Sequence, residues 1–183
     1  MLQTVDSTNI YAKELIKKGQ KPPFLITSKT QTAGRGRLGK SFYSPEGGLY
    51  MSFVLNYSEN EQQTTLAAAV GVCRVLEKHC GICPHIKPVN DLLVDGKKVC
   101  GILCEAVCEQ NGQIGTVIIG IGINIWSQNF LVPDELKDIA GTVKSALANT
   151  ELANLIAQEI TETVNRGAKY FLPGYESRLL KTL

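Results

Sequence analysis

No stretch of 18 consecutive apolar residues occurs in the 183-residue chain, so the sequence predicts no transmembrane helix. Residues 1–21 carry lysines without an apolar segment, which excludes a secretory signal. Glycine has no triplet period, and 44% hydrophobic with 20% charged residues exclude a collagen-like or disordered chain. We therefore expect one globular domain, residues 1–183, located in the cytoplasm.

Histidine is scarce, and this limits the chemistry that the chain can perform. With only His79 and His85, a histidine-activated nucleophile is not expected. Cys80 and Cys83 resemble half of a zinc site, but the sequence has no second pair at a suitable spacing. We interpret the six cysteines as reduced, buried and inert thiols and predict no metal site.

The net charge of +2 predicts no partner, but its distribution is uneven. Residues 1–48 carry a net charge of +5 and the remaining residues a net charge of −3. This excess favours an anionic ligand near the N-terminal half, although a solvated helix face that carries Lys13, Lys17 and Lys18 accounts for part of it. The excess is too small and too scattered to indicate nucleic acid.

Hydrophobic periodicity predicts helices and strands in separate blocks, joined largely by hairpins. Asp95-Gly96 and Asn111-Gly112 are turn signals, and the even positions from 100 to 108 place one strand face toward the core. Pro173-Gly174 should end the last helix. We predict helices at 10–18, 61–78, 133–140 and 151–170, strands at 24–27, 49–55, 92–94, 99–109 and 116–124, and a long loop at 29–48. This is an α+β pattern.

A glycine-rich segment at residues 34–39 places a basic residue between glycines. The spacing matches G-x-G-x-x-G, but Pro45 and the glycines that follow do not allow the helix that a dinucleotide site requires. Arg35, Arg37 and Lys40 instead favour a loop that grips an anion, with a mobile solvated loop as the alternative.

Two further segments are candidates for a ligand cleft. Lys98 directly precedes an apolar strand and would project into a cleft, while Lys97 would point to solvent; surface charge is the alternative for both. Gly120 and Gly122 leave one strand face without side chains, which suits a bound ligand or close strand packing equally.

Four segments together resemble the catalytic domain of biotin protein ligases. They are residues 6–9 (Asp-Ser-Thr-Asn), 31–40 (Gln-Thr-Ala-Gly-Arg-Gly-Arg-Leu-Gly-Lys), 87–105, which includes Asn90-Asp91, and 120–124 (Gly-Ile-Gly-Ile-Asn). The resemblance covers residues 1–170. It implies an α+β, class II synthetase-like fold of the biotin/lipoate ligase type, with helices packed on one side of a mixed sheet.

The resemblance implies that biotin and ATP, with Mg²⁺, form biotinyl-5′-AMP, which a lysine of a biotin carboxyl carrier domain then captures. Arg37, Lys98 and Asp91 would be catalytic. The expected biotin-binding residues are Ser7, Thr8, Asn9, Gln31, Arg35, Gly36, Arg37, Lys98 and Gly101. The expected ATP- or adenylate-binding residues are Arg37, Lys40, Asn90 and Asn124. A free sheet edge would allow a homodimer or strand addition by the carrier.

Three departures from the family pattern carry expectations of their own. Pro88 stands where the family usually has tryptophan, so an aromatic wall of the biotin cleft should be missing. No winged-helix segment precedes residue 6, so we expect no DNA binding. The sequence ends at Leu183, without the SH3-like barrel usual in the family. The alternatives are a lipoate or octanoate ligase or transferase of the same fold, and a non-catalytic biotin- or nucleotide-binding module.

Overall fold

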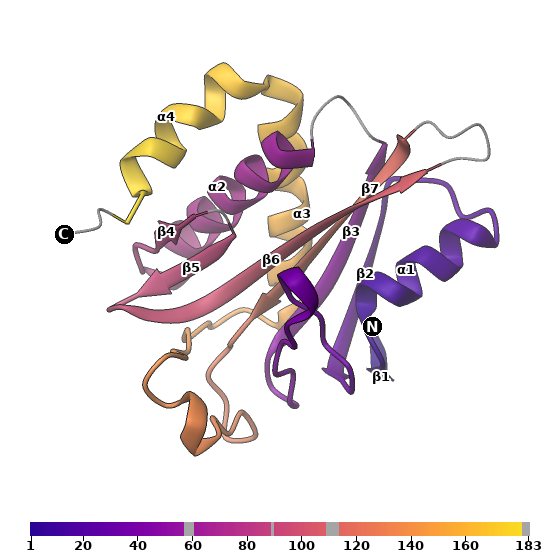
Figure 1. Ribbon diagram of the computed structural model, residues 1–183. Helices are drawn as coiled ribbons and strands as arrows, with labels where there is room; N and C mark the ends of the chain where they lie inside the picture. The colour runs from indigo at the N-terminus through magenta and orange to yellow at the C-terminus, as the bar shows by residue number, and fades with distance from the viewer. Residues whose placement is uncertain (57–60, 89, 109–113, 181–183) are drawn as a thin grey trace.

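One mixed sheet organises the molecule, and its strands follow the order β1-β2-β3-β7-β6-β5-β4 (Figure 1). The computed structural model describes residues 1–56, 61–88, 90–108 and 114–180. β1 runs parallel to β2, and the other neighbouring pairs are antiparallel. The strands are β1 Leu2–Val5, β2 Phe24–Gln31, β3 Leu49–Asn56, β4 His85–Lys87, β5 Asp91–Val94, β6 Lys97–Cys108 and β7 Ile114–Ile123.

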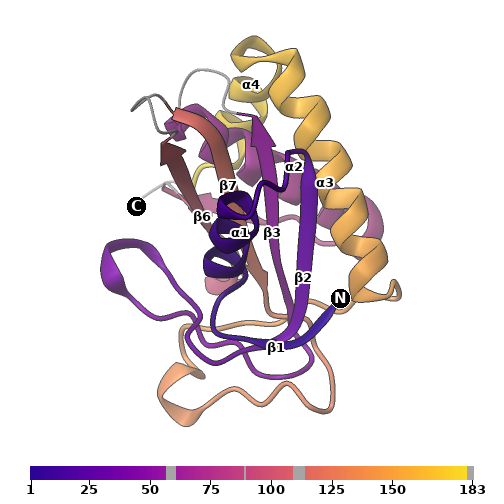
Figure 2. The same cartoon turned by 90° about the vertical axis from the view of Figure 1, so that its right-hand side faces the viewer.

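Helices cover both faces of this sheet. α2 (Glu61–Cys80) and α3 (Asn149–Arg166) lie on one face, as the resemblance implies, together with α4 (Ala168–Arg178), which was not predicted. α1 (Thr8–Lys17) lies on the opposite face, against β2, β3 and β7 (Figure 2). The expectation that all helices pack on one side is therefore wrong for α1. None of the described helices is both long and apolar enough to cross a bilayer.

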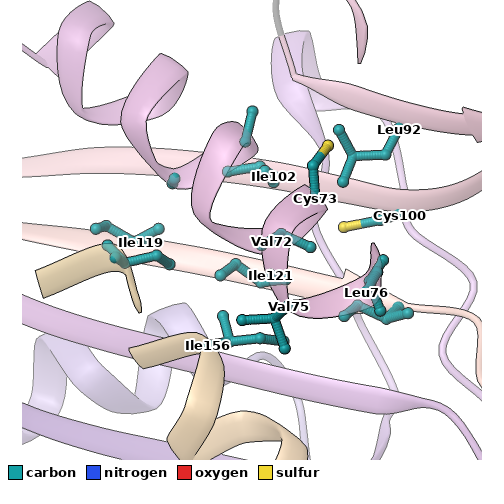
Figure 3. Close-up of a cluster of buried hydrophobic side chains, with 14 of the residues drawn as sticks. Val72, Cys73, Val75, Leu76, Leu92, Cys100, Ile102, Ile119, Ile121 and Ile156 are labelled. Atoms are coloured by element: carbon teal, nitrogen blue, oxygen red, sulfur yellow. The ribbon is translucent and has the colours of Figure 1, made fainter. Parts of the chain in front are cut away.

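The main core fills the layer between the sheet and α2 and α3 (Figure 3). α2 is apolar on almost every side because it is covered all round: the sheet packs against one side, and α3 and α4 cover the others. Each fully buried aliphatic side chain contributes about 1.5–3 kcal/mol. The residues that meet there include Val72, Cys73, Val75, Leu76, Cys100, Ile102, Ile119, Ile121 and Ile156.

A smaller apolar cluster anchors α1 to the other face. Ala12 packs there against Ile26, Val54 and Ile118. Because strand side chains alternate, Ile118 points to α1 while its neighbours in β7 point to the main core. The next even position of β7, Gly120, lies on the α1 face directly below Asn9.

Local turn chemistry decides several element boundaries. Asp95 and Gly96 both have positive φ, +50° and +76°, and form the predicted tight turn between β5 and β6. The predicted turn at 111–112 lies outside the described residues. Pro173-Gly174 does not end the last helix, which corrects the prediction: Gly167, with φ +76°, ends α3, and Pro173 lies inside α4. The segment predicted as a helix at 133–140 contains only a short 3₁₀ turn, Asp134–Leu136.

Two strands at the sheet edges were not predicted. β1 and β4 are short edge strands of four and three residues, too short for a periodic signal. β2 extends to Gln31 because residues 28–31 pair with β1, so the loop predicted to start at residue 29 starts later.

Candidate active site

A bulge in β6 determines where Lys98 points. Leu92 pairs with Cys100, and Leu93 pairs with Lys98, so Val99 is an extra residue in β6. Simple alternation would place Lys98 on the same face as Cys100, inside the main core. The extra residue moves Lys98 to the face of Gly101, where its Nζ lies 3.2 Å from the position that a Cβ on Gly101 would take.

Lys98 is paired with a carboxylate on this face. Its Nζ lies 2.7 Å from Asp91 Oδ1, and the two side chains are 36% and 25% exposed. Asp91 Oδ1 is fully covered and accepts no hydrogen bond of good geometry, so the attraction between the opposite charges dominates this contact. An anion that enters the site would compete with Asp91 for Lys98.

The glycine-rich segment is a short hairpin rather than the start of a helix. Gly36 N–H donates to Lys40 O at 2.7 Å, and Phe42 N–H donates to Gly34 O at 2.8 Å. A three-residue 3₁₀ turn, Arg37–Gly39, forms the tip. The structure therefore lacks, in this described segment, the helix N-terminus that a dinucleotide site would need. We call residues 34–42 the arginine hairpin.

Phe42 closes the base of the arginine hairpin over two glycines. A Cβ on Gly122 would overlap the Phe42 ring, and one on Gly101 would lie 2.9 Å from it. The ring also lies 5.6 Å from Lys98 Nζ, within the range of a cation–π contact. Both strands thus need glycine at these positions so that an aromatic side chain can lie on the sheet.

The first turn of α1 supplies uncharged polar groups beside the hairpin. Ser7, Thr8 and Asn9 are almost fully buried. Gln31 Oε1 accepts hydrogen bonds from Thr8 N at 2.9 Å and from Thr8 Oγ1 at 3.2 Å, and its Nε2 donates to Ser44 Oγ at 2.9 Å. The end of β2 and the start of α1 are therefore joined through side chains.

Asn9 is fixed by a buried network that includes an acidic residue. Its Nδ2 donates to Glu105 Oε2 at 2.8 Å, and its Oδ1 accepts from Ser52 Oγ at 2.6 Å. Glu105 also pairs with Lys13 at 2.7 Å and with Arg35 of the arginine hairpin at 3.6 Å. Burial opposes the charge of Glu105, but the hydrogen bonds and charges of its partners outweigh burial and lower the pKa of this carboxyl group.

These elements enclose one cavity of about 270 Å³. With the exception of Asn124, the predicted site residues line it, although their individual roles stay predictions. They are Ser7, Thr8, Asn9, Gln31, Arg35, Gly36, Arg37, Lys40, Asn90, Asp91, Lys98 and Gly101. Arg37 and Lys40 are exposed at its mouth. Asp91 is the only carboxylate among the described lining residues, so the cavity favours an anion.

One sequence expectation needs correction here, and another stays untested. Pro88 is exposed and does not line the cavity, and Phe42 supplies an aromatic side chain, so the cavity does not lack an aromatic wall. Asn124 is not among the residues that line the ligand-free cavity, and its Nδ2 donates to Lys98 O and Gly141 O. Its expected contact with the adenylate stays a prediction.

Phe42 and Glu105 were missed as site residues for different reasons. Phe42 follows the recognised motif without a distinguishing pattern of its own. Glu105 had a usable signal, since an acid on the face of β6 opposite Cys100, Ile102 and Cys104 needs a partner when it is half buried.

The cysteines take no part in this cavity, and the expectation that they are buried is wrong for Cys83 and Cys108, which are exposed. Cys73 and Cys100 are buried in the main core, and burial raises the pKa of the Cys73 thiol to about 12 and that of Cys100 further. Such thiols are unreactive. In the part of the chain that the structure describes, no three His, Cys, Asp or Glu side chains are grouped to hold a metal ion.

Comparison with known proteins agrees with this arrangement of sheet, hairpin and cavity. Residues 1–124 match the Biotin/lipoate A/B protein ligase family. The chain belongs to this family. It is 42% identical over 146 residues to the bifunctional ligase/repressor BirA of Bacillus subtilis, across 78% of this chain and 45% of the relative. It is 34% identical over 130 residues to the biotin–[acetyl-CoA-carboxylase] ligase of Paracoccus denitrificans, across 68% of this chain and 53% of the relative.

The fold matches a solved ligase over nearly the whole chain. The biotin protein ligase from Aquifex aeolicus, solved in complex with biotin and ATP, superposes with a TM-score of 0.80 at 31% identity. The match covers 98% of this chain and 77% of that protein. The chain spans about half the length of the curated relatives it matches.

Proposed function

We propose that this chain is a biotin protein ligase: it joins biotin to ATP as biotinyl-5′-AMP and transfers biotin to a lysine of a carrier domain. The observation that carries this proposal is the convergence of Arg35, Arg37 and Lys40 from the arginine hairpin with Lys98 from β6 on one cavity. The names of the Bacillus and Paracoccus relatives and the biotin and ATP bound to the Aquifex protein support it.

The first step brings two anions together. A biotin carboxylate oxygen attacks the α-phosphate of ATP, a P–O bond forms, and the bond to the leaving pyrophosphate breaks. Cations must offset the repulsion and the charge that grows at phosphorus, and Arg37 and Lys98, which line the cavity, would do so. We assign the head group of biotin to Ser7–Asn9 and Gln31, near the Phe42 ring, and its carboxylate to Arg35 and the Gly36 and Gly101 backbone.

The second step needs an acceptor lysine without its proton. In the ligand-free structure Asp91 is paired with Lys98. When the adenylate takes over Lys98, Asp91 becomes available to orient the acceptor amine and accept its proton. The amine nitrogen then attacks the acyl carbon, the acyl–phosphate bond breaks, AMP leaves with the electron pair, and the new amide nitrogen releases its surplus proton to solvent.

ATP would arrive as its Mg²⁺ complex, in which the metal ion offsets phosphate charge. Mg²⁺ is usually held by substrate phosphates and one or two carboxylates, and Asp91 is the one carboxylate that the described cavity lining offers. Lys40 and Asn90 would contact the nucleotide. The arrangement fits a metal ion that enters and leaves with its nucleotide.

We infer that the second substrate is a biotin carboxyl carrier domain of a cytoplasmic carboxylase. The name of the Paracoccus relative, biotin–[acetyl-CoA-carboxylase] ligase, supports this choice. Strand addition at an edge of the sheet would serve such a carrier or a second copy of this chain.

Mass spectrometry of quenched reactions tests the proposal. The purified chain is incubated with MgATP and with biotin, lipoate or octanoate, and then with a carrier domain or with its variant in which the acceptor lysine is arginine. We expect biotinyl-5′-AMP only with biotin, and a biotinylated carrier only with biotin and the intact lysine. Lipoyl- or octanoyl-AMP would assign the chain to the alternative ligase, and saturable binding without any adenylate would make it a binding module.

A further inference from the structure

Glu105 lies on β6, faces the first turn of α1 and is not among the described residues that line the cavity. Its side chain is 17% exposed. Asn9 Nδ2 lies 2.8 Å from Oε2, and Lys13 Nζ and Arg35 Nη2 lie 2.7 Å and 3.6 Å from Oε1. Because each of these three neighbours is a donor, only a group with two acceptor oxygens can serve them all. The carboxylate of Glu105 meets this need, and the two chemical steps make no use of it.

Asn9 connects this carboxylate to two further strands. Its Nδ2 also donates to Leu103 O at 3.3 Å, and its Oδ1 accepts from Ser52 Oγ of β3 at 2.6 Å. A Cβ on Gly120 of β7 would lie 2.4 Å from Oδ1, so the carboxamide packs directly on the sheet. The side chain is almost fully buried, and both hydrogens of its Nδ2 are committed to β6. The position of the first turn of α1 is therefore set by groups in β3, β6 and β7.

Arg35 brings a second part of the cavity lining to the same carboxylate. Asn9 and Arg35 both line the cavity, one at the start of α1 and the other in the arginine hairpin, and both contact Glu105. The pair with Arg35 spans 3.6 Å and the Arg35 side chain is 44% exposed, so this pair contributes little by itself. The bond to Asn9 and the ion pair with Lys13 hold the carboxylate to which Arg35 is attracted. Glu105 thus joins two elements that the proposed biotin site includes.

We propose that Glu105 is a positioning residue for the biotin site, which holds the first turn of α1 and the arginine hairpin in place relative to β6. The consequence for biotin rests on the proposed ligase function, whereas the consequence for α1 does not. In Glu105→Gln the new amide N–H faces a donor whichever way it turns, so a contact is lost. If the site then adopts its binding-competent arrangement about a tenth of the time, the apparent Kd rises about tenfold.

Calorimetric titration with biotin, in the absence of ATP, measures the effect on the ligand. We expect Glu105→Gln to raise the Kd for biotin about tenfold. Glu105→Asp keeps both acceptor oxygens on a shorter side chain and should raise the Kd less. The control is Glu14→Gln, on the exposed side of α1, which should leave the Kd within about twofold of the wild-type value. A glutamine variant that binds biotin as well as the wild type, or an aspartate variant weaker than the glutamine variant, would overturn the proposal.

A double-mutant cycle shows whether Glu105 acts through its partner on α1. In an Asn9→Ala background, Glu105→Gln should weaken biotin binding clearly less than it does in the wild type, because the main partner is already gone. In turnover, Glu105→Gln should raise the KM for biotin and change the KM for ATP by less than about twofold. An undiminished effect in the Asn9→Ala background, or an equal rise in both KM values, would contradict a role in positioning the biotin site.

Hydrogen exchange of the ligand-free protein tests the position of α1 without any ligand. The backbone amides of Thr8 and Tyr11 are both hydrogen-bonded at the first turn. Glu105→Gln should speed their exchange by at least about fivefold, while the Lys18 amide at the other end of α1 keeps its wild-type rate. Glu105→Asp should give a smaller change in the same direction and serves if the glutamine variant does not fold. Unchanged rates at Thr8 and Tyr11, or the same increase along the whole helix, would refute the proposal even if the wild-type chain binds no biotin.

Discussion

At the scale of single residues, side chains in this site are placed by small irregularities that alternation does not predict. Lys98 reaches the cavity only because Val99 is inserted in β6. Phe42 lies on the sheet only because Gly101 and Gly122 have no side chain. The sequence predicts a Lys98 that faces a cleft, but the bulge that turns it there depends on how β5 and β6 pair across their hairpin, which residue types alone do not indicate.

Replacing the cavity lysine should affect the chemical step selectively. We expect Lys98→Ala to lower the rate of adenylate formation by at least about tenfold, because an ammonium group that stabilises the growing charge is lost. The matched control is Lys97→Ala, since Lys97 is the exposed neighbour whose Nζ donates to Lys137 O. Pyrophosphate release should fall for the first variant and stay within about twofold for the second. Equal effects would remove Lys98 from the mechanism.

Glu105 should make stability depend on pH. Its folded-state pKa is lowered, so the folded protein holds the carboxylate ionised at pH values where the unfolded chain already binds a proton. The stabilisation is fully present above the ordinary glutamate pKa of about 4.3 and is lost as the pH falls through the folded value.

Urea unfolding of the wild type and Glu105→Gln between pH 7 and pH 3 measures this contribution. The stability advantage of the wild type should shrink as the medium is acidified. The exposed Glu14→Gln variant is the control and should show no such change. An advantage that is the same at every pH would refute the role of the charge.

At the scale of elements, the strong periodic signals were reliable and the boundaries were not. α2, β3 and β7 follow their predicted ranges closely because each is a long apolar run packed on both sides. β1 and β4 are edge strands whose existence depends on their partners. The end of α3 depends on the backbone conformation of Gly167, whereas the more conspicuous Pro173 is accommodated inside α4. The approach of α1 to the face opposite α2 is a tertiary outcome that local sequence does not encode.

The β5–β6 turn should be sensitive to the residue at its second position. Gly96 has φ +76°, which costs other residues about 1–2 kcal/mol. Gly96→Ala should therefore lower the free energy of unfolding by that amount, and urea denaturation would measure it. Asp95→Asn at φ +50° is the control and should be neutral, because asparagine tolerates this conformation. A neutral Gly96→Ala would contradict the turn geometry.

At the scale of the whole molecule, the cavity joins parts of the fold that are distant in sequence. Its walls come from the start of α1, the end of β2, the arginine hairpin, β6 and β7. A ligand that bridges these elements binds the folded state and not the unfolded chain, so it must stabilise the fold.

Thermal unfolding followed by calorimetry should show this linkage. With either ligand alone at about 100 times its Kd, biotin or ATP should raise Tm by about 5–10 °C. Biotin and ATP together should raise Tm by more than the sum of the shifts that each gives alone, because the same cations of the cavity would stabilise both bound anions. Arg37→Ala should reduce that excess. Strictly additive shifts would indicate two independent sites.

The most direct test of the account is isotope exchange between labelled pyrophosphate and ATP. If a carboxylate and an α-phosphate react between Arg37 and Lys98, the chain will move label into ATP only when biotin is present, and Lys98→Ala will slow that exchange by at least about tenfold. Exchange that proceeds equally well without biotin, or no exchange with all three components present, would contradict the assignment of this cavity to adenylate formation.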